Sequence, residues 1–225
     1  MKILTLTFAL ALSLFAKDID LSQFNKLALF QQNHLEALES LEIDGLYYIK
    51  VKRNNKITNI FLSKNKKVLI QGEGMYLKDG TPVIFKMNTA PVIGKESFSF
   101  GTGKKVLYVF TDPECPYCRK FNKAMHKLKD KYTFKVYLFP LSFHKNARAM
   151  SEWILSAKND EEKARRLYEV SHGSTKYSNA KIAPLQREKA TKLLDATIKL
   201  GNKISISGTP TVFDREGNMV NWPAL

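Results

Sequence analysis

The chain has 225 residues, of which 44% are hydrophobic and 25% are charged. This composition is typical of a folded globular protein and excludes a collagen-like or largely disordered chain. The 36 lysines and arginines exceed the 21 acidic residues, so the formal net charge is +15. Because the basic residues are scattered along the chain beside no nucleic-acid-binding motif, we interpret them as a solvated surface and expect no nucleic-acid partner.

Residues 1–16 have the pattern of a secretory signal peptide. Lys2 gives a positive start, an apolar stretch follows, and Ala16 is a candidate cleavage residue. The apolar stretch is too short to span a bilayer comfortably. We therefore predict that the protein is exported to a compartment in which disulfides persist.

Residues 17–88 contain no cysteine and predict a small α+β domain. Helical spacing of apolar residues begins near Phe24 and recurs at Leu35, Leu38 and Leu41, so we expect helical segments there. Short-strand patterns separated by turn signals follow at residues 46–51, 57–62, 67–71 and 83–87. Nothing in this domain has a catalytic pattern, so we interpret it as a dimerisation or client-docking domain.

Residues 89–103 predict a linker. They contain Pro91, Gly94, Gly101 and Gly103, which argue against a long regular element. We therefore place the domain boundary here and begin the second domain at residue 104.

The second domain is organised around residues 106–125, which read VLYVFTDPECPYCRKFNKAM. The apolar run at 106–110 predicts a buried strand, and the apolar stripe after the second cysteine predicts an amphipathic helix. Cys115 and Cys118 therefore lie where a strand is followed by a helix, with Pro116 and Tyr117 as the dipeptide between them. Pro116 suits the first helical turn, where an N–H has no partner within the helix.

This position predicts redox chemistry at the two cysteines. The unpaired N–H groups and partial positive charge of a helix N-terminus would stabilise a thiolate at Cys115. Cys118, one turn further on, would then resolve a mixed disulfide formed on Cys115.

Three structural interpretations of the cysteines are weaker. A structural zinc site needs four ligands, and the two cysteines and four histidines show no paired ligand spacing. A c-type haem would need a histidine where Arg119 stands. A purely structural disulfide across two residues would close too small a loop to stabilise the fold much. We expect neither a metal nor another cofactor.

Two strands and a helical insertion are predicted after the motif. Residues 133–139 predict a strand, residues 144–202 an insertion with three helices, and residues 211–213 a strand that turns into a hairpin. Thr209 and Pro210 directly precede this last strand. A functional role for His144 is conceivable because it follows a strand end, but we interpret it as a surface histidine at a helix start.

The order strand, CPYC, helix, strand, helical insertion, GTP and hairpin resembles the thioredoxin fold. Within it, FTDPECPYCRKF, SFHKNARAMSEWI and SGTPTVF resemble the DsbC/DsbG family of exported thiol:disulfide interchange proteins over most of residues 104–220. The resemblance implies that the bond before Pro210 is cis and lies against the cysteines, and that Thr209 helps to position a substrate segment. It also implies a periplasmic homodimer that a DsbD-like membrane reductant keeps reduced.

The expected architecture is therefore α+β, with a cystatin-like dimerisation domain joined by the linker to a thioredoxin-fold domain. The thioredoxin fold normally closes with a helix after the hairpin. Residues 221–225 encode none, so we expect that helix to be missing.

The resemblance implies a protein that isomerises or reduces wrong disulfides in exported proteins through its CPYC dithiol. Two alternatives stay open: a DsbA-type dithiol oxidase and a chaperone-like holdase of the same fold. The thiol state of the cysteines in the cell separates the first two. Holding activity that survives replacement of both cysteines would identify the third.

Overall fold

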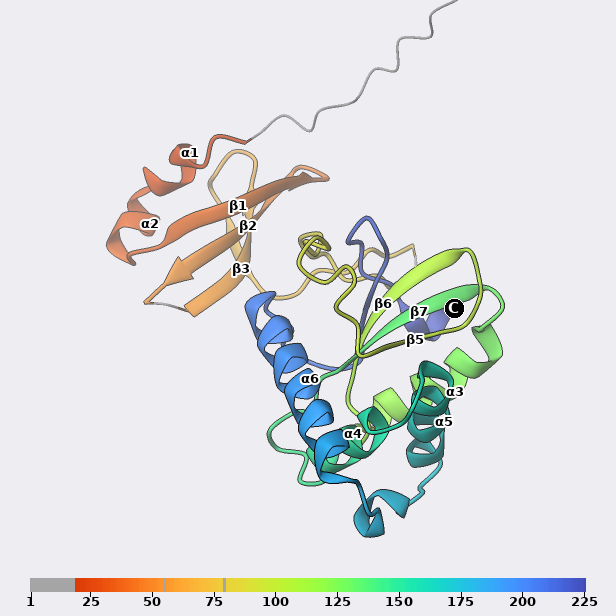
Figure 1. The fold of residues 1–225 in the computed structure, drawn as a ribbon. Helices are drawn as coiled ribbons and strands as arrows, with labels where there is room; N and C mark the ends of the chain where they lie inside the picture. Colours follow the sequence, from red (N-terminus) through yellow and green to blue (C-terminus); the bar gives the residue numbers. More distant parts are fainter. Residues whose placement is uncertain (1–18, 55, 79) are drawn as a thin grey trace, which may run out of the picture. The chain divides into compact units, whose positions relative to one another are not determined.

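The computed structural model describes residues 19–54, 56–78 and 80–225. They fall into two compact units that meet in the sequence between Glu73 and Gly74 (Figure 1). The signal peptide predicted at residues 1–16 lies outside the described residues. Within the described ranges, no helix has both the length and the hydrophobicity that a membrane crossing requires.

The first unit is a four-stranded antiparallel sheet in the order β1-β2-β3-β4, preceded by two short helices (Figure 1). Its elements are α1 (Ser22–Asn25), α2 (Ala28–Gln32), β1 (Glu36–Ile43), β2 (Leu46–Arg53), β3 (Lys56–Ser63) and β4 (Leu69–Gln71). Phe24 and Phe30 from the helices pack against Ile49, Val51 and Ile60 of the sheet. Predictions of a sheet-containing N-terminal region are thus confirmed, whereas the specific cystatin-like topology stays a prediction.

The helix expected through Leu35, Leu38 and Leu41 is wrong, because this stretch forms β1. Residues of β1 pair with β2 along its length, apart from an irregularity between Ala37 and Glu39. The hairpin turns at Asp44 and Gly45, whose φ angles of 43° and 81° suit an Asp-Gly turn. The helical spacing of the three leucines is only a weak local preference, and the pairing of residues 36–43 with β2 outweighs it.

The second unit carries a four-stranded sheet in the order β5-β7-β6-β8, in which β6 and β7 are parallel and the outer pairs antiparallel. The strands are β5 (Phe98–Phe100), β6 (Lys105–Thr111), β7 (Tyr132–Leu138) and β8 (Thr211–Phe213). The helices are α3 (Pro116–Leu128), α4 (Ala147–Leu155), α5 (Asp160–Ser171) and α6 (Pro184–Lys203), with 3₁₀ turns η1 (Lys176–Asn179) and η2 (Trp222–Ala224).

The structure differs from the predicted domain boundary and linker. Residues 74–103 belong to the second unit. Met87 N donates to Gly217 O at 2.7 Å, and a Cβ on Gly217 would lie 2.0 Å from Met87 O. Val92 is fully buried, and Phe98–Phe100 pairs with β7. The prolines and glycines that argued for a linker therefore lie in a segment that packs on this sheet and then joins it.

Alternate residues of the central strands face opposite sides of this sheet, as the period of a strand requires. Leu107 and Val109 face a large cluster to which α3, α4, α5 and α6 contribute, and these helices lie together in Figure 1. Tyr108 and Phe110 face a second cluster that includes Val92 and Phe213. Burial on both faces explains why residues 106–110 are continuously apolar.

After β8 the chain turns back along it. Phe213 and Met219 form a single bridge, and Val220 N donates to Val212 O at 2.9 Å, so the second strand of the expected hairpin is short. The chain then enters η2, where the Trp222 ring lies 5.3 Å from that of Phe121. Trp222 thus packs against the face of the sheet that α3 covers.

Candidate functional site

Cys115 occupies the N-cap position of α3, directly before Pro116 at the first helical position. Its backbone is extended, with φ −64° and ψ 126°, and its N–H donates to Asp112 O at 3.2 Å. The residue is 6% exposed. The N-terminal end of α3 therefore presents the Cys115 sulfur beside the unpaired N–H groups of the first turn, as the sequence predicts.

Cys118 lies one turn further along α3 and is fully buried. Asp112 N donates to its Sγ at 3.4 Å. Burial raises the pKa of the Cys118 thiol to about 12. Both cysteines are free thiols. The two residues therefore differ in depth, because Cys115 retains 6% exposure and Cys118 has none.

Thr209 and Pro210 are far from the cysteines in the sequence but lie beside Cys115 in the fold. The Thr209–Pro210 bond is cis, as predicted. Cys115 Sγ lies 3.5 Å from Thr209 O, to which its S–H donates. The fold thus brings residues 115 and 209 into contact although 94 positions separate them.

The dipeptide between the cysteines is at the surface. Pro116 is exposed, and the Tyr117 side chain is 64% exposed with the Lys120 ammonium 5.7 Å from its ring centre. Both residues of the dipeptide are therefore open to a molecule that approaches this end of α3, whereas Cys115 itself is buried.

Asp112 is the residue of the site that sequence reasoning left unplaced. Its carboxylate is fully buried and accepts hydrogen bonds from the N–H groups of Glu114 at 2.8 Å, Cys115 at 3.3 Å and Leu141 at 2.7 Å. His144 Nδ1 lies 2.8 Å from Asp112 Oδ2. His144 is therefore not the surface histidine that we expected. The signal in the sequence was its place in the segment that follows β7, the strand beside the motif strand.

Glu114 turns away from the dithiol. Its carboxylate accepts hydrogen bonds from Asn146 N at 2.7 Å and Asn146 Nδ2 at 3.1 Å. Asn146 is the N-cap of α4. Glu114 thus connects the motif loop to the start of the helical insertion, where a negative charge is favourable at a helix N-terminus.

A chain of buried polar side chains runs from the motif strand to α5. The Thr111 hydroxyl donates to Asn122 Oδ1 at 3.4 Å, and Asn122 Nδ2 donates to Ser171 Oγ at 3.1 Å. Ser171 in turn donates to Leu167 O at 2.8 Å. These contacts satisfy polar groups that would be costly to bury alone, and they fix α3 against the insertion.

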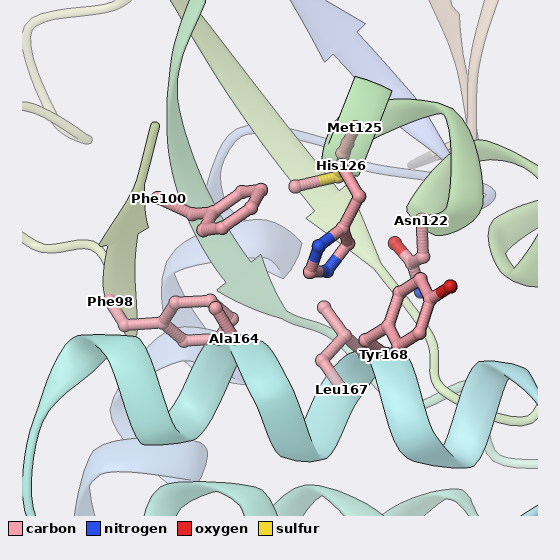
Figure 2. A pocket seen from close by; sticks show the side chains of 8 residues that line it. All are labelled: Phe98, Phe100, Asn122, Met125, His126, Ala164, Leu167 and Tyr168. Carbon is pink, nitrogen blue, oxygen red and sulfur yellow. The ribbon is translucent and has the colours of Figure 1, made fainter. Parts of the chain in front are cut away.

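A small cavity lies between α3 and α5 (Figure 2). Its volume is about 10 Å³, room for about one water molecule, so it cannot hold a cofactor. On its wall the His126 ring lies 4.6 Å from the ring of Phe100 and 4.1 Å from that of Tyr168 (Figure 2). Burial, followed by the charges of Lys129 and His172, lowers the pKa of His126.

Comparison with known proteins matches residues 100–223 to the thioredoxin-like domain family. No curated protein matches the chain significantly. Among solved structures, Helicobacter pylori DsbG is 14% identical, with a TM-score of 0.42 over 83% of this chain and 97% of that one. The catalytic domain of Proteus mirabilis ScsC is 21% identical, with a TM-score of 0.45 over 60% and 88% of the two chains.

A disulfide interchange protein from Neisseria gonorrhoeae is 20% identical, with a TM-score of 0.44 over 54% of this chain and 79% of that one. Likenesses at these identities and scores identify neither a client nor a partner. The family match covers more than half of the chain and contains both cysteines and the cis proline. The chain therefore belongs to the thioredoxin-like family, with the dithiol site of a thiol–disulfide oxidoreductase.

Proposed function

We propose that this protein isomerises or reduces wrong disulfides in exported proteins. The observation that carries the proposal is the arrangement of Cys115, Cys118 and Thr209. The Cys115 thiol, at a helix N-terminus and 6% exposed, contacts the carbonyl before a cis proline, and the fully buried Cys118 thiol lies one turn further along the helix. This arrangement allows the Cys115 sulfur to attack a client disulfide, and it keeps the Cys118 sulfur buried nearby for attack on the mixed disulfide.

In the first step the Cys115 thiolate attacks one sulfur of a client disulfide. A bond forms between Cys115 Sγ and that sulfur, the client S–S bond breaks, and the other client sulfur leaves as a thiolate that takes up a proton. That client thiol, once it loses the proton again, can attack a second disulfide of the client, and the thiolate released there attacks the mixed disulfide and displaces the Cys115 thiolate. This sequence returns the dithiol unchanged, so it isomerises the client without net oxidation or reduction.

In the reductive branch Cys118 loses its proton and attacks Cys115 Sγ. The Cys115–Cys118 disulfide forms and the client leaves as a thiol, so the client gains the two electrons that the dithiol loses. Burial raises the pKa of the Cys118 thiol to about 12, so this branch requires Cys118 to give up its proton first, whereas the isomerising sequence does not.

Thr209 and Pro210 fit a role in holding the client. Pro210 has no N–H, so it offers no donor to a neighbouring strand, and Thr209 lies against the attacking sulfur. An extended client segment could pair with the backbone of Thr209 by strand addition. Their proposed role is to align a client disulfide with Cys115.

The setting of the activity is proposed from the sequence. The pattern of residues 1–16 supports export to the periplasm, and a DsbD-like membrane reductant would restore the dithiol. The first unit is proposed to form a homodimer. Exposed apolar side chains on that unit support this, since Ile57 is 59% and Val68 55% exposed.

Two measurements test the function. The purified mature chain should reactivate a scrambled multi-disulfide protein in a glutathione buffer, and the Cys115→Ser variant should not. Acid trapping and alkylation of growing cells should find Cys115 and Cys118 reduced. A predominantly oxidised pair in the cell would favour the dithiol oxidase instead, and client holding by a variant without either cysteine would favour the holdase.

A further inference from the structure

The Asp112–His144 pair has no part in the chemistry above, although Asp112 contacts both cysteines. The Asp112 carboxylate accepts the N–H of Cys115, and the Asp112 N–H donates to Cys118 Sγ. The carboxylate is completely buried, and its remaining neighbour is the imidazole of His144. The three N–H groups satisfy the oxygen atoms of this buried carboxylate, which would be costly to bury without partners.

A negative charge at this place works against the catalytic thiolate. Like charges within a few ångströms in a partly buried site disfavour each other, so Asp112 alone would make a Cys115 thiolate less stable. The N–H groups that Asp112 accepts carry no net charge. His144 can add a full positive charge on the opposite side of the carboxylate, because histidine gains a proton in the mildly acidic range.

Other charged groups around the pair are engaged elsewhere or face solvent. Glu114 is held by Asn146, and Arg119 Nε donates to Pro113 O at 3.2 Å. Lys145 is exposed. The position of His144 is fixed by two contacts. Its backbone N–H donates to Leu141 O at 3.0 Å, and the centre of the Phe143 ring lies 4.5 Å from the centre of the imidazole ring. Among the described contacts, the imidazole is thus the side chain of a basic residue that lies against the Asp112 carboxylate.

We propose that His144 is a positioning residue that tunes the dithiol. Its imidazole holds the buried Asp112 carboxylate against the Cys115 N–H. When it is protonated, its charge offsets that carboxylate and increases the reactivity of Cys115 in mildly acidic solution. This inference deepens the proposed function, because it concerns the regulation of the same thiol.

The decisive measurement is the rate at which iodoacetamide alkylates Cys115 in the reduced mature chain, followed by peptide mass spectrometry from pH 5 to pH 8. The His144→Asn variant keeps a neutral N–H donor near the position of Nδ1 and removes the charge. We expect it to react about three- to tenfold more slowly than wild type at pH 6 and to approach the wild-type rate at pH 8.

Two further variants isolate the cause. His172→Gln is the matched control, because His172 Nδ1 contacts a backbone carbonyl, that of Tyr168, and not a carboxylate; its profile should follow wild type. In an Asp112→Asn background, His144→Asn should have no further effect, as coupled residues require. If Asp112→Asn does not fold, the comparison of His144→Asn with wild type still decides.

Coincident wild-type and His144→Asn profiles across this pH range would overturn the proposal. Alkylation needs no client, so the result is independent of the proposed function. A protein with the expected profile and no isomerase activity would refute that function alone. An active isomerase in which His144→Asn reacts like wild type would refute this inference alone.

Discussion

The sheet of the second unit is buried on both faces, whereas the sheet of the first unit supports one hydrophobic cluster among the described residues. Among the described residues, all polar or charged residues classed as buried belong to the second unit. These residues are Ser97, Thr111, Asp112, Asn122, Ser151, Ser171 and Thr197. Several of them lie around the two cysteines. Burying polar groups is unfavourable, and the larger apolar core of the second unit offsets this free-energy cost.

The first unit has an apolar cluster and no buried polar residue among its described residues. Large apolar side chains are exposed on both units, among them Ile57 and Val68 on the first and Leu77 and Phe143 on the second. The buried polar groups are therefore what separates the two units, and they assign the chemistry to the second. Assembly through the first unit is a proposal that its exposed apolar side chains support.

The largest expected effect is at the cysteines. Cys115→Ser should reduce insulin reduction to background, because the attacking sulfur is lost. Cys118→Ser should keep the attack but lose reductive release, so clients should accumulate as mixed disulfides on Cys115 in non-reducing gels. Ile57→Ser in the first unit is the control and should keep the wild-type rate of insulin reduction. Reductase activity in the Cys115→Ser protein would contradict the assignment of Cys115 as the attacking thiol.

The next effect concerns assembly. A fragment of residues 74–225 should be monomeric by light scattering, because the proposed interface is gone. It should keep dithiol reductase activity and lose most isomerase activity, since a single site holds misfolded clients poorly. The cut belongs at Gly74 and not near Gly103, because β5 and Val92 are part of the second unit's core. A full mature chain that is already monomeric would contradict the dimer.

A smaller effect tests whether the two units are independent. Ile49 is fully buried in the first unit, so Ile49→Ala should lower that unit's free energy of unfolding by about 2–5 kcal/mol. The rate of insulin reduction at low temperature should not change. The control Gln32→Ala, at an exposed polar position of the same unit, should alter stability by less than about 0.5 kcal/mol. Loss of reductase activity in Ile49→Ala alongside an intact second unit would show that the first unit supports the dithiol directly.

The smallest effect is a pH dependence in the second unit. The pKa of His126 is lower in the folded protein than its ordinary value of 6.5, so the unfolded chain binds more protons below about pH 6.5. Stability should therefore fall as the pH drops from 6.5 towards the folded pKa. In His126→Phe, which keeps an aromatic ring against Phe100 and Tyr168, urea unfolding should show a smaller difference between pH 7.5 and pH 5.5. An equal difference in both proteins would exclude His126 as the source.

Local sequence determined the motif and its immediate structure. The apolar run at 106–110 predicted β6, Pro116 predicted the start of α3, and the two together placed Cys115 and Cys118 at a strand–helix junction. The helices of residues 144–202 followed from the same periodicity. These features depend on neighbours within a few residues of one another, so the pattern of side chains was sufficient.

Tertiary structure decided what depended on distant partners. Residues 36–43 became a strand because β2 was available to pair with them, and β5 joined the sheet because β7 accepted it. Asp112 and His144 are 32 positions apart, and only the packing of the loop after β7 against the motif joined them. Composition and spacing describe how a side chain faces its own element, but the hydrogen-bond partner of a buried side chain comes from whichever segment the fold brings beside it.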